Sequence, residues 1–183
     1  MLKKWKKLSS EYIIKHKYFN ARKDVCELPD GRKVDPYFVM EIPLSVCALA
    51  ITADDKVIMI KQYRHAVNDI LLEIPGGFVD EGEDMPTAVK RELMEETGYA
   101  FEEVMELGKV FSNPGILSMD TYLFVATGGK KVADQSFDPN EDIEMEFVSL
   151  DEVITMLKEN KIPQALHSTC IFYALSKLGK LQY

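Results

Sequence analysis

Apolar residues cluster in two long runs near the middle of the chain, at residues 45–52 and 57–63. The four residues between the runs, Ala-Asp-Asp-Lys, are typical of a tight turn, so the pattern predicts a buried β-hairpin. A shorter apolar segment at residues 71–74 predicts another strand. It leads through Pro75-Gly76-Gly77 into a loop, where paired glycines would let the backbone approach a metal or a phosphate closely.

The second half of the chain mixes strand and helix patterns. Residues 104–110 and 121–126 predict two strands, and residues 143–148 alternate between apolar and acidic positions as a half-buried strand does. Two helices are predicted at residues 150–159 and 164–178. Because strands and helices do not alternate as regular βαβ units, we expect an α+β fold in which helices flank a mixed sheet.

The N-terminal residues form a separate piece. Residues 12–38 predict two or three short strands around a turn at Pro29-Asp30-Gly31. A small hairpin sheet is only marginally stable in water, so this piece must pack on something else. We therefore expect an N-terminal β segment at residues 1–43 and one larger domain at residues 44–183.

Composition narrows the class of protein. The chain of 183 residues is 46% apolar, which suffices for one substantial core, and its formal net charge of −8 argues against a nucleic acid partner. It contains no apolar run of the roughly 18 residues that a membrane span needs, and its lysine-rich start lacks the apolar stretch of a secretion signal. We expect a cytoplasmic protein without a membrane partner, in which Cys26, Cys47 and Cys170 are reduced and mostly buried.

A helix predicted at residues 85–97 carries the candidate chemistry. Asp84 can cap its first turn, Pro86 suits that turn and Gly98 can end the helix. Three of its carboxylates fall within an arc of about 100° on one face, namely those of Glu92, Glu95 and Glu96. Like charges at this spacing cost roughly a few tenths of a kcal/mol per pair, so stability alone would not select the pattern. The cluster indicates a bound cation.

The wider pattern around this helix is specific. It consists of Gly77, five residues, Glu83, seven residues, and then Arg-Glu-Leu-Met-Glu-Glu-Thr-Gly-Tyr from Arg91 to Tyr99. At every defined position it resembles the signature of the Nudix hydrolases, which cleave a nucleoside diphosphate linked to another moiety. The resemblance implies a three-layer α/β/α sandwich around a mixed sheet, to which the small N-terminal sheet is added. Arg91 and Glu83 are expected to hold the loop and the helix together by ion pairing.

The resemblance also implies a divalent metal site. Glu92 and Glu96 match the main metal ligands of the family, Glu95 matches an additional ligand, and the carbonyl of Gly76 matches a backbone ligand. The expected ion is Mg²⁺, with Mn²⁺ as the alternative, and the number of ions stays open. An acidic protein can bind an anionic diphosphate when such a metal bridges the two sets of negative charge.

Three features outside the signature resemble the branch that hydrolyses ADP-ribose and related nucleoside diphosphate sugars. They are Arg64 at the end of the second core strand, Glu73, and Pro114, which lies fifteen residues beyond Tyr99. This resemblance implies that these three residues bind substrate and that the products are a nucleoside monophosphate and a sugar phosphate. It also implies a homodimer in which the N-terminal segment, residues 1–43, is swapped onto the other subunit. The alternatives are a sanitising hydrolase of modified nucleoside triphosphates and a non-catalytic nucleotide-sugar-binding module.

The general base is the least defined part of the site. In the related hydrolases a glutamate in the loop before the last strand serves as the base, and here that loop reads Asp-Pro-Asn-Glu-Asp at residues 138–142. The aligned base position falls on a proline, which cannot accept a proton. Glu141 is therefore the first candidate and Asp142 the second. The catalytic glutamates of the helix, Glu95 and Glu96, are the remaining candidates.

Overall fold

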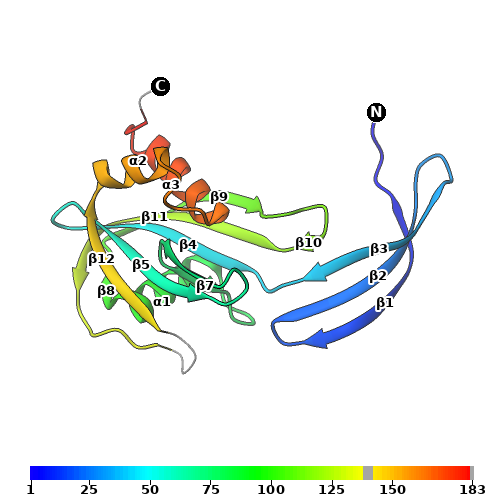
Figure 1. The fold of residues 1–183 in the computed structure, drawn as a ribbon, viewed down its shortest axis with the longest axis horizontal. Coiled ribbons are helices and arrows are strands. Elements are labelled where there is room, and N and C mark those ends of the chain that lie inside the picture. Colours follow the sequence, from blue (N-terminus) through cyan, green and yellow to red (C-terminus); the bar gives the residue numbers. More distant parts are fainter. Residues whose placement is uncertain (138–141, 182–183) are drawn as a thin grey trace. The chain divides into compact units, whose positions relative to one another are not determined.

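The computed structural model describes residues 1–137 and 142–181. The chain divides into two compact units (Figure 1). Unit 1 consists of residues 1–44 and 111–120, and unit 2 consists of the described residues within 45–110 and 121–183. A short segment from the middle of the sequence therefore belongs to the same unit as the N-terminal strands.

Unit 1 is a four-stranded sheet in the order β1-β2-β3-β10. Its strands are β1 (Lys6–His16), β2 (Phe19–Glu27), β3 (Lys33–Glu41) and β10 (Leu117–Ser118). The first three are antiparallel, and β10 pairs in parallel with β3. The predicted turn is confirmed between β2 and β3, where the Gly31 N–H donates to the Leu28 carbonyl. β1 begins at Lys6, earlier than the predicted start at residue 12. It is exposed along its whole length, so buried positions do not mark where it begins.

Unit 2 is built on an eight-stranded sheet. Its central path runs β12-β5-β4-β11-β8, while β6, β7 and β9 pair with β5, β4 and β11 respectively. The strands are β4 (Ser45–Thr52), β5 (Lys56–Arg64), β6 (Asp69–Glu73), β7 (Gly76–Phe78), β8 (Tyr99–Ala100), β9 (Glu103–Phe111), β11 (Asp120–Lys131) and β12 (Ile143–Ser149). Because β11 is parallel to β4 whereas β5 is antiparallel to both β4 and β12, the sheet is mixed, as the sequence predicted.

Helices cover both faces of this sheet. They are α1 (Met85–Thr97), α2 (Leu150–Lys158) and α3 (Ala165–Lys177). Side chains of β4 alternate between two cores: Cys47 and Leu49 pack with α2 and α3, whereas Val46 and Ala48 pack with α1. Burial of both faces explains the uninterrupted apolar run of β4. The expected α/β/α sandwich is confirmed.

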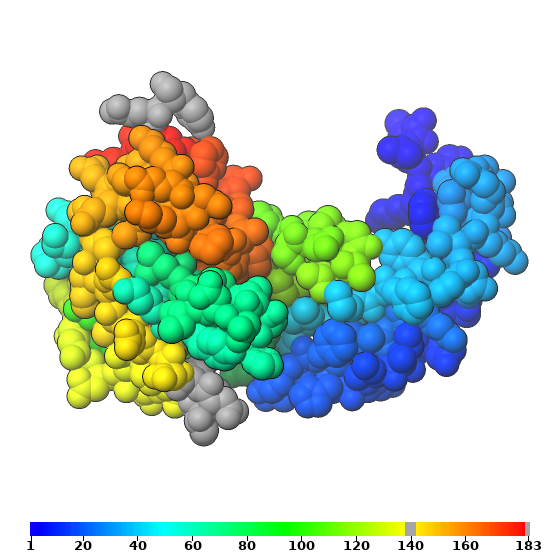
Figure 2. Space-filling view, in the orientation of Figure 1, coloured from blue at the N-terminus to red at the C-terminus, as the bar shows by residue number. Residues whose placement is uncertain are grey.

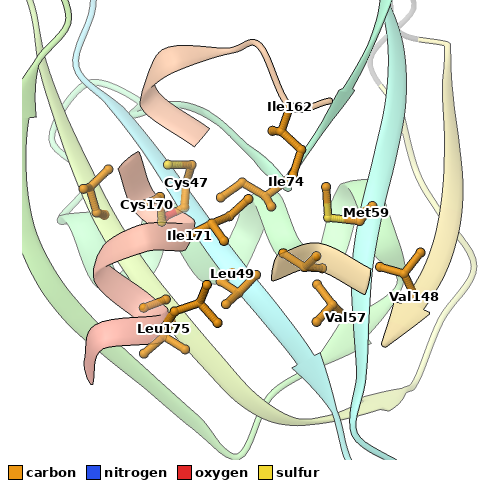
Figure 3. Close-up of a cluster of buried hydrophobic side chains, with 14 residues drawn as sticks. Cys47, Leu49, Val57, Met59, Ile74, Val148, Ile162, Cys170, Ile171 and Leu175 are labelled. Carbon is orange, nitrogen blue, oxygen red and sulfur yellow. The ribbon is translucent and has the colours of Figure 1, made fainter. Parts of the chain in front are cut away.

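The core on the α3 side is shown in Figure 3, where Ile171 and Leu175 of α3 lie near Leu49 of β4. On the surface of unit 2, α2 and α3 form the orange and red regions in Figure 2.

The α2 helix begins with a capping box in which Ser149 and Glu152 accept hydrogen bonds from each other's backbone N–H. Both C-terminal helices are confirmed with nearly the predicted bounds.

The cysteines are free, as expected, and Cys47 and Cys170 are buried while Cys26 is half-buried. A hydrogen bond with Cys170, together with burial, raises the pKa of Cys47 well above its usual value, so its thiol stays protonated. These two residues therefore act as packing groups in the core. In the part of the chain that the structure describes, no helix combines the length and the apolar character that crossing a membrane requires.

Candidate active site

The acidic helix α1 spans Met85–Thr97, the bounds that the sequence predicted. Asp84 caps it by accepting a hydrogen bond of 2.8 Å from the Thr87 N–H. The helix ends at Gly98, whose φ of +73° is left-handed and whose N–H donates to the Met94 carbonyl. Its apolar face packs on the sheet, which fixes the direction of the acidic face.

Two of the three clustered glutamates are buried. Glu92 is only 8% exposed and Glu96 only 3%, although both carry carboxylates. Glu96 Oε2 accepts a hydrogen bond of 2.8 Å from the Gly76 N–H. A Cβ atom on Gly77 would lie 2.5 Å from the Glu92 carboxylate, so this position accepts only glycine unless Glu92 moves. The paired glycines of β7 thus bring the backbone against the two buried carboxylates.

Arg91 ties the third glutamate into the same cluster. Its Nη1 atom lies 2.9 Å from a carboxylate oxygen of Glu92 and 2.9 Å from one of Glu95. Its Nε and Nη2 atoms donate to the two oxygens of Glu83 at 3.1 and 3.0 Å, and Nη2 also donates to the Phe78 carbonyl. The hydrogen bonds from Arg91 lower the pKa of Glu83 and raise the pKa of Arg91 itself, so the pair stays ionised. The expected ion pairing of loop and helix is confirmed.

The glutamate cluster fits a divalent cation by its chemistry. Among residues 1–137 and 142–181, no three His, Cys, Asp or Glu side chains stand close enough together to hold a metal ion as they are. Glu92 and Glu95 nevertheless converge on one Arg91 nitrogen, and the buried carboxylate of Glu96 accepts the Gly76 N–H, so each glutamate already contacts Arg91 or the Gly76 backbone. Carboxylate and carbonyl oxygens are the ligands that Mg²⁺ prefers. The metal-binding roles of the three glutamates and of Gly76 stay predictions.

A second charged pair lies on the neighbouring strands β5 and β6. Nε and Nη2 of Arg64 donate to the two carboxylate oxygens of Glu73 at 3.1 and 2.5 Å. Glu73 is fully buried, whereas the Arg64 side chain is 40% exposed. A bidentate bond to a buried carboxylate fixes the guanidinium while leaving part of it accessible. The structure therefore joins two candidate substrate-binding residues that the sequence analysis had selected separately.

His167 lies beside this pair, and the sequence analysis did not select it. Its Nδ1 atom accepts a hydrogen bond of 3.3 Å from the Ile74 N–H and lies 3.8 Å from Glu73 Oε2. Burial lowers the pKa of His167 to about 4, an effect that Glu73 opposes and Arg64 reinforces, so the ring is neutral at pH 7. Since 93 positions separate His167 from Ile74, no local pattern could have signalled the contact.

Pro114, the third candidate substrate-binding residue, lies in unit 1. It lines a cavity of about 270 Å³ whose walls include the aromatic side chains of Tyr37 and Phe111. The Tyr37 hydroxyl donates a hydrogen bond of 2.7 Å to the Gly115 carbonyl, which holds the Pro114 loop against β3. The cavity thus belongs to the N-terminal sheet and to the segment that joins it, and the role of Pro114 stays a prediction.

The candidate general bases lie before β12. Glu141 falls outside the described residues, while Asp142 is described and is exposed. Upstream of this loop, the Gln135 side-chain amide and the Ser136 N–H donate hydrogen bonds of 2.6 and 2.9 Å to carbonyls in the last turns of α1. These contacts, which the sequence analysis missed, attach the segment that enters the loop to the acidic helix.

Two sequence models of known domains match the chain. The model of the NUDIX domain matches residues 41–167. The model of the nucleoside diphosphate sugar hydrolase N-terminal domain matches residues 5–40. The two matches adjoin each other and together cover most of the chain.

Individual proteins are similar over nearly the same length. The methanol dehydrogenase activator of Bacillus methanolicus is 33% identical over 158 residues, which cover 86% of this chain and 85% of that protein. The ADP-ribose pyrophosphatase of Bacillus subtilis (strain 168) is 27% identical over 169 residues, which cover 92% and 91%. Among solved structures, an ADP compounds hydrolase aligns over 99% of both chains with a TM-score of 0.85 and 23% identity. That last similarity shows a shared fold.

Proposed function

This chain belongs to the Nudix hydrolase family, and we propose that it cleaves the pyrophosphate bond of ADP-ribose or another nucleoside diphosphate sugar, giving a nucleoside monophosphate and a sugar phosphate. The observation that carries the proposal is the match of residues 5–40 to the N-terminal domain of nucleoside diphosphate sugar hydrolases, directly before the Nudix domain. This N-terminal segment argues against a hydrolase of modified nucleoside triphosphates.

Glu92, Glu95 and Glu96, with the carbonyl of Gly76, would hold the divalent metal, for which we propose Mg²⁺ with Mn²⁺ as the alternative. When bound, the metal supplies charge neutralisation to the diphosphate. Arg91 keeps the glutamates in place, because its hydrogen bonds to Glu92 and Glu95 join two side chains that would otherwise repel each other. The intact and partly buried glutamate set favours an enzyme over a non-catalytic binding module.

We propose that Arg64 binds a phosphate group of the substrate. The support is its geometry, since the buried Glu73 carboxylate fixes a guanidinium that is 40% exposed. A planar guanidinium is well suited to phosphate oxygens. Pro114 is the third proposed substrate-binding residue, supported by its place in an aromatic-walled cavity of unit 1.

We propose that the protein is a cytoplasmic homodimer that assembles through unit 1. Large apolar side chains on the strands of this unit are exposed, among them Tyr12 at 44%, Ile13 at 54% and Phe38 at 53%. β1 is the edge strand of its sheet. Exposed apolar side chains beside an open strand edge are typical of a protein interface. The free cysteines fit a reducing compartment.

The proton of the attacking water needs an acceptor, and we propose Glu141 in that role, with Asp142 as the second candidate. The attachment of Gln135 and Ser136 to the last turns of α1 supports this proposal, because these two residues precede the loop in the sequence and contact the acidic helix.

A substrate panel tests the proposed function. Purified protein with Mg²⁺ would be assayed against ADP-ribose, GDP-mannose, UDP-glucose, diadenosine polyphosphates and oxidised nucleoside triphosphates. We expect the highest kcat/KM with a diphosphate sugar and products that are a nucleoside monophosphate and a sugar phosphate. A clear preference for triphosphates would overturn the assigned substrate class and leave the family unchanged.

A further inference from the structure

The Ile74 backbone lies between two parts of the site. On one side is Glu73, the last residue of β6, which holds Arg64. On the other side, after Pro75, is Gly76, whose N–H holds Glu96. Ile74 is fully buried, so its N–H would be costly if it lacked an acceptor. A shift of this backbone would therefore move the contacts of both the Arg64 guanidinium and the buried Glu96 carboxylate.

His167 supplies the acceptor. Its Nδ1 atom accepts the Ile74 N–H at 3.3 Å, and this contact requires the tautomer whose proton is on Nε2. The backbone that carries the ring is also fixed. The side-chain oxygen of Gln164, the N-cap residue of α3, accepts hydrogen bonds from the N–H groups of Leu166 and His167. Burial keeps the pKa of His167 near 4, so at pH 7 the ring does not compete with Arg64 for the Glu73 carboxylate.

We propose that His167 is a positioning residue for the hydrolysis: by holding the Ile74 backbone, it sets the place of the Glu73 carboxylate and thereby of the Arg64 guanidinium. The inference rests on the proposed function in that Arg64 is taken to bind the substrate. His167 touches neither substrate nor metal in this role. It connects the first turn of α3 to the strand end that carries the charged pair.

Two substitutions of His167 separate the hydrogen bond from packing. His167→Leu keeps a similar volume without an acceptor, whereas His167→Asn places a carbonyl oxygen near the position of Nδ1. We expect His167→Leu to raise KM for ADP-ribose by about tenfold while kcat changes by less than about threefold, because substrate binding is what Arg64 supplies. His167→Asn should restore KM to within about threefold of the wild type. An unchanged KM in His167→Leu would overturn the proposal.

Cys170→Ala is the matched control. Cys170 lies on the same helix and packs near Cys47 of β4 (Figure 3). Its thiol donates to the Phe124 carbonyl. It does not touch the Ile74 N–H, so its truncation should lower the melting temperature and leave KM at the wild-type value. If Cys170→Ala raises KM as much as His167→Leu does, the effect is a general loosening of α3 and the positioning role is wrong.

A double-mutant cycle tests whether His167 acts through Arg64. If it does, the KM of the double variant His167→Leu, Arg64→Ala should equal that of Arg64→Ala alone, since the group that His167 positions is then missing. Independent, multiplying increases in KM would contradict the proposal. The same cycle can be measured on the free energy of unfolding with His167→Leu and Glu73→Gln, which needs no substrate.

The substrate-free measurement keeps the two hypotheses apart. If ADP-ribose and the other diphosphate sugars are not hydrolysed, the proposed function fails, and the unfolding cycle and the ¹⁵N chemical shifts of the His167 ring still decide whether the ring holds Ile74 beside Glu73. If the sugars are hydrolysed but neither KM nor unfolding shows coupling, the positioning role fails alone. A shift pattern with the proton on Nδ1 would also overturn it.

Discussion

Gly77 lies so close to Glu92 that a Cβ atom at position 77 would come within 2.5 Å of the Glu92 carboxylate. We therefore expect Gly77→Ala to displace the Glu92 side chain and to lower turnover by about 10²-fold, the usual scale when a positioned catalytic group moves. Because the clash involves the end of a side chain, stability should change little. Kinetics and thermal unfolding would measure both effects.

Substitutions of two other glycines serve as controls for this result. Gly31→Ala places a Cβ atom in open space and strains only a turn of unit 1, so its turnover should stay near the wild type. Gly76→Ala would meet the Val46 carbonyl at 2.3 Å, a backbone clash that should destabilise the pairing of β7 with β4. Normal turnover in Gly77→Ala would show that Glu92 need not occupy this place.

The Glu96→Gln substitution tests the metal site. A glutamine can still accept the Gly76 N–H, so the protein without metal should be about as stable as the wild type, while turnover falls by several orders of magnitude. Added Mg²⁺ should raise the melting temperature of the wild type, since a ligand that binds only the folded state stabilises it. The increase should be smaller for the variant. The control is Glu81→Gln in the exposed loop before α1. Near-normal turnover in Glu96→Gln would contradict the assignment.

The parts of the fold that the sequence predicted are those with a local cause. The bounds of α1 follow from Asp84 and Gly98, and the β4–β5 hairpin follows from a continuous apolar run that is buried on both faces. The length of β1 could not be predicted, because none of its residues is buried. β10 could not be predicted either, because it has two residues and pairs with a strand far earlier in the chain.

The same distinction applies to the site. The spacing within one helix sufficed to select Glu92, Glu95 and Glu96. The sequence also selected Arg64 and Glu73, but the β5–β6 register pairs Arg64 with Asp69 and Glu73 with Ile60. No local pattern therefore specifies their bidentate contact. The contacts made by His167 and Gln135 join segments that only the tertiary fold brings together.

The general base can be located by comparing neighbouring carboxylates. We expect Glu141→Gln to lower kcat by about 10²-fold or more with little change in KM, which is the usual effect of removing a general base. Asp142→Asn tests the second candidate in the same way. If Glu141→Gln is nearly silent and Asp142→Asn is not, the base is Asp142. If neither variant matters, the base belongs to the glutamates of α1.

Assembly is tested by hydrodynamics. The exposed apolar side chains of unit 1 lead us to expect a dimer in sedimentation velocity. Deletion of residues 1–40 removes β1 and β2 and nearly all of β3, which leaves β10 without its partner strand, so the product should aggregate or be an inactive monomer. A stable, active monomer would show that the segment is dispensable for both assembly and catalysis.

The buried ring of His167 predicts a specific dependence of stability on pH. Its pKa is lowered to about 4 in the folded protein, chiefly by burial, against an ordinary value of 6.5 in the unfolded chain. Between these two values the unfolded state binds one proton more than the folded state, so the free energy of unfolding rises with pH in this window. The contribution is fully present above pH 6.5 and is lost as the pH falls toward 4, by about 3 kcal/mol in total.

Comparing the wild type with a variant isolates the contribution of His167 to the free energy of unfolding. Asp24 and Glu83 also have lowered pKa values and lose stabilising contacts in acid, but they do so equally in the wild type and in His167→Asn. The asparagine does not titrate, so the stability of the wild type should fall relative to that of His167→Asn from pH 6.5 to pH 4. His65→Asn, which replaces an exposed histidine by the same residue, is the matched control variant. Parallel profiles for the wild type and His167→Asn would mean that the ring is not buried in its neutral form, because only a shifted pKa can make the two curves diverge in this window.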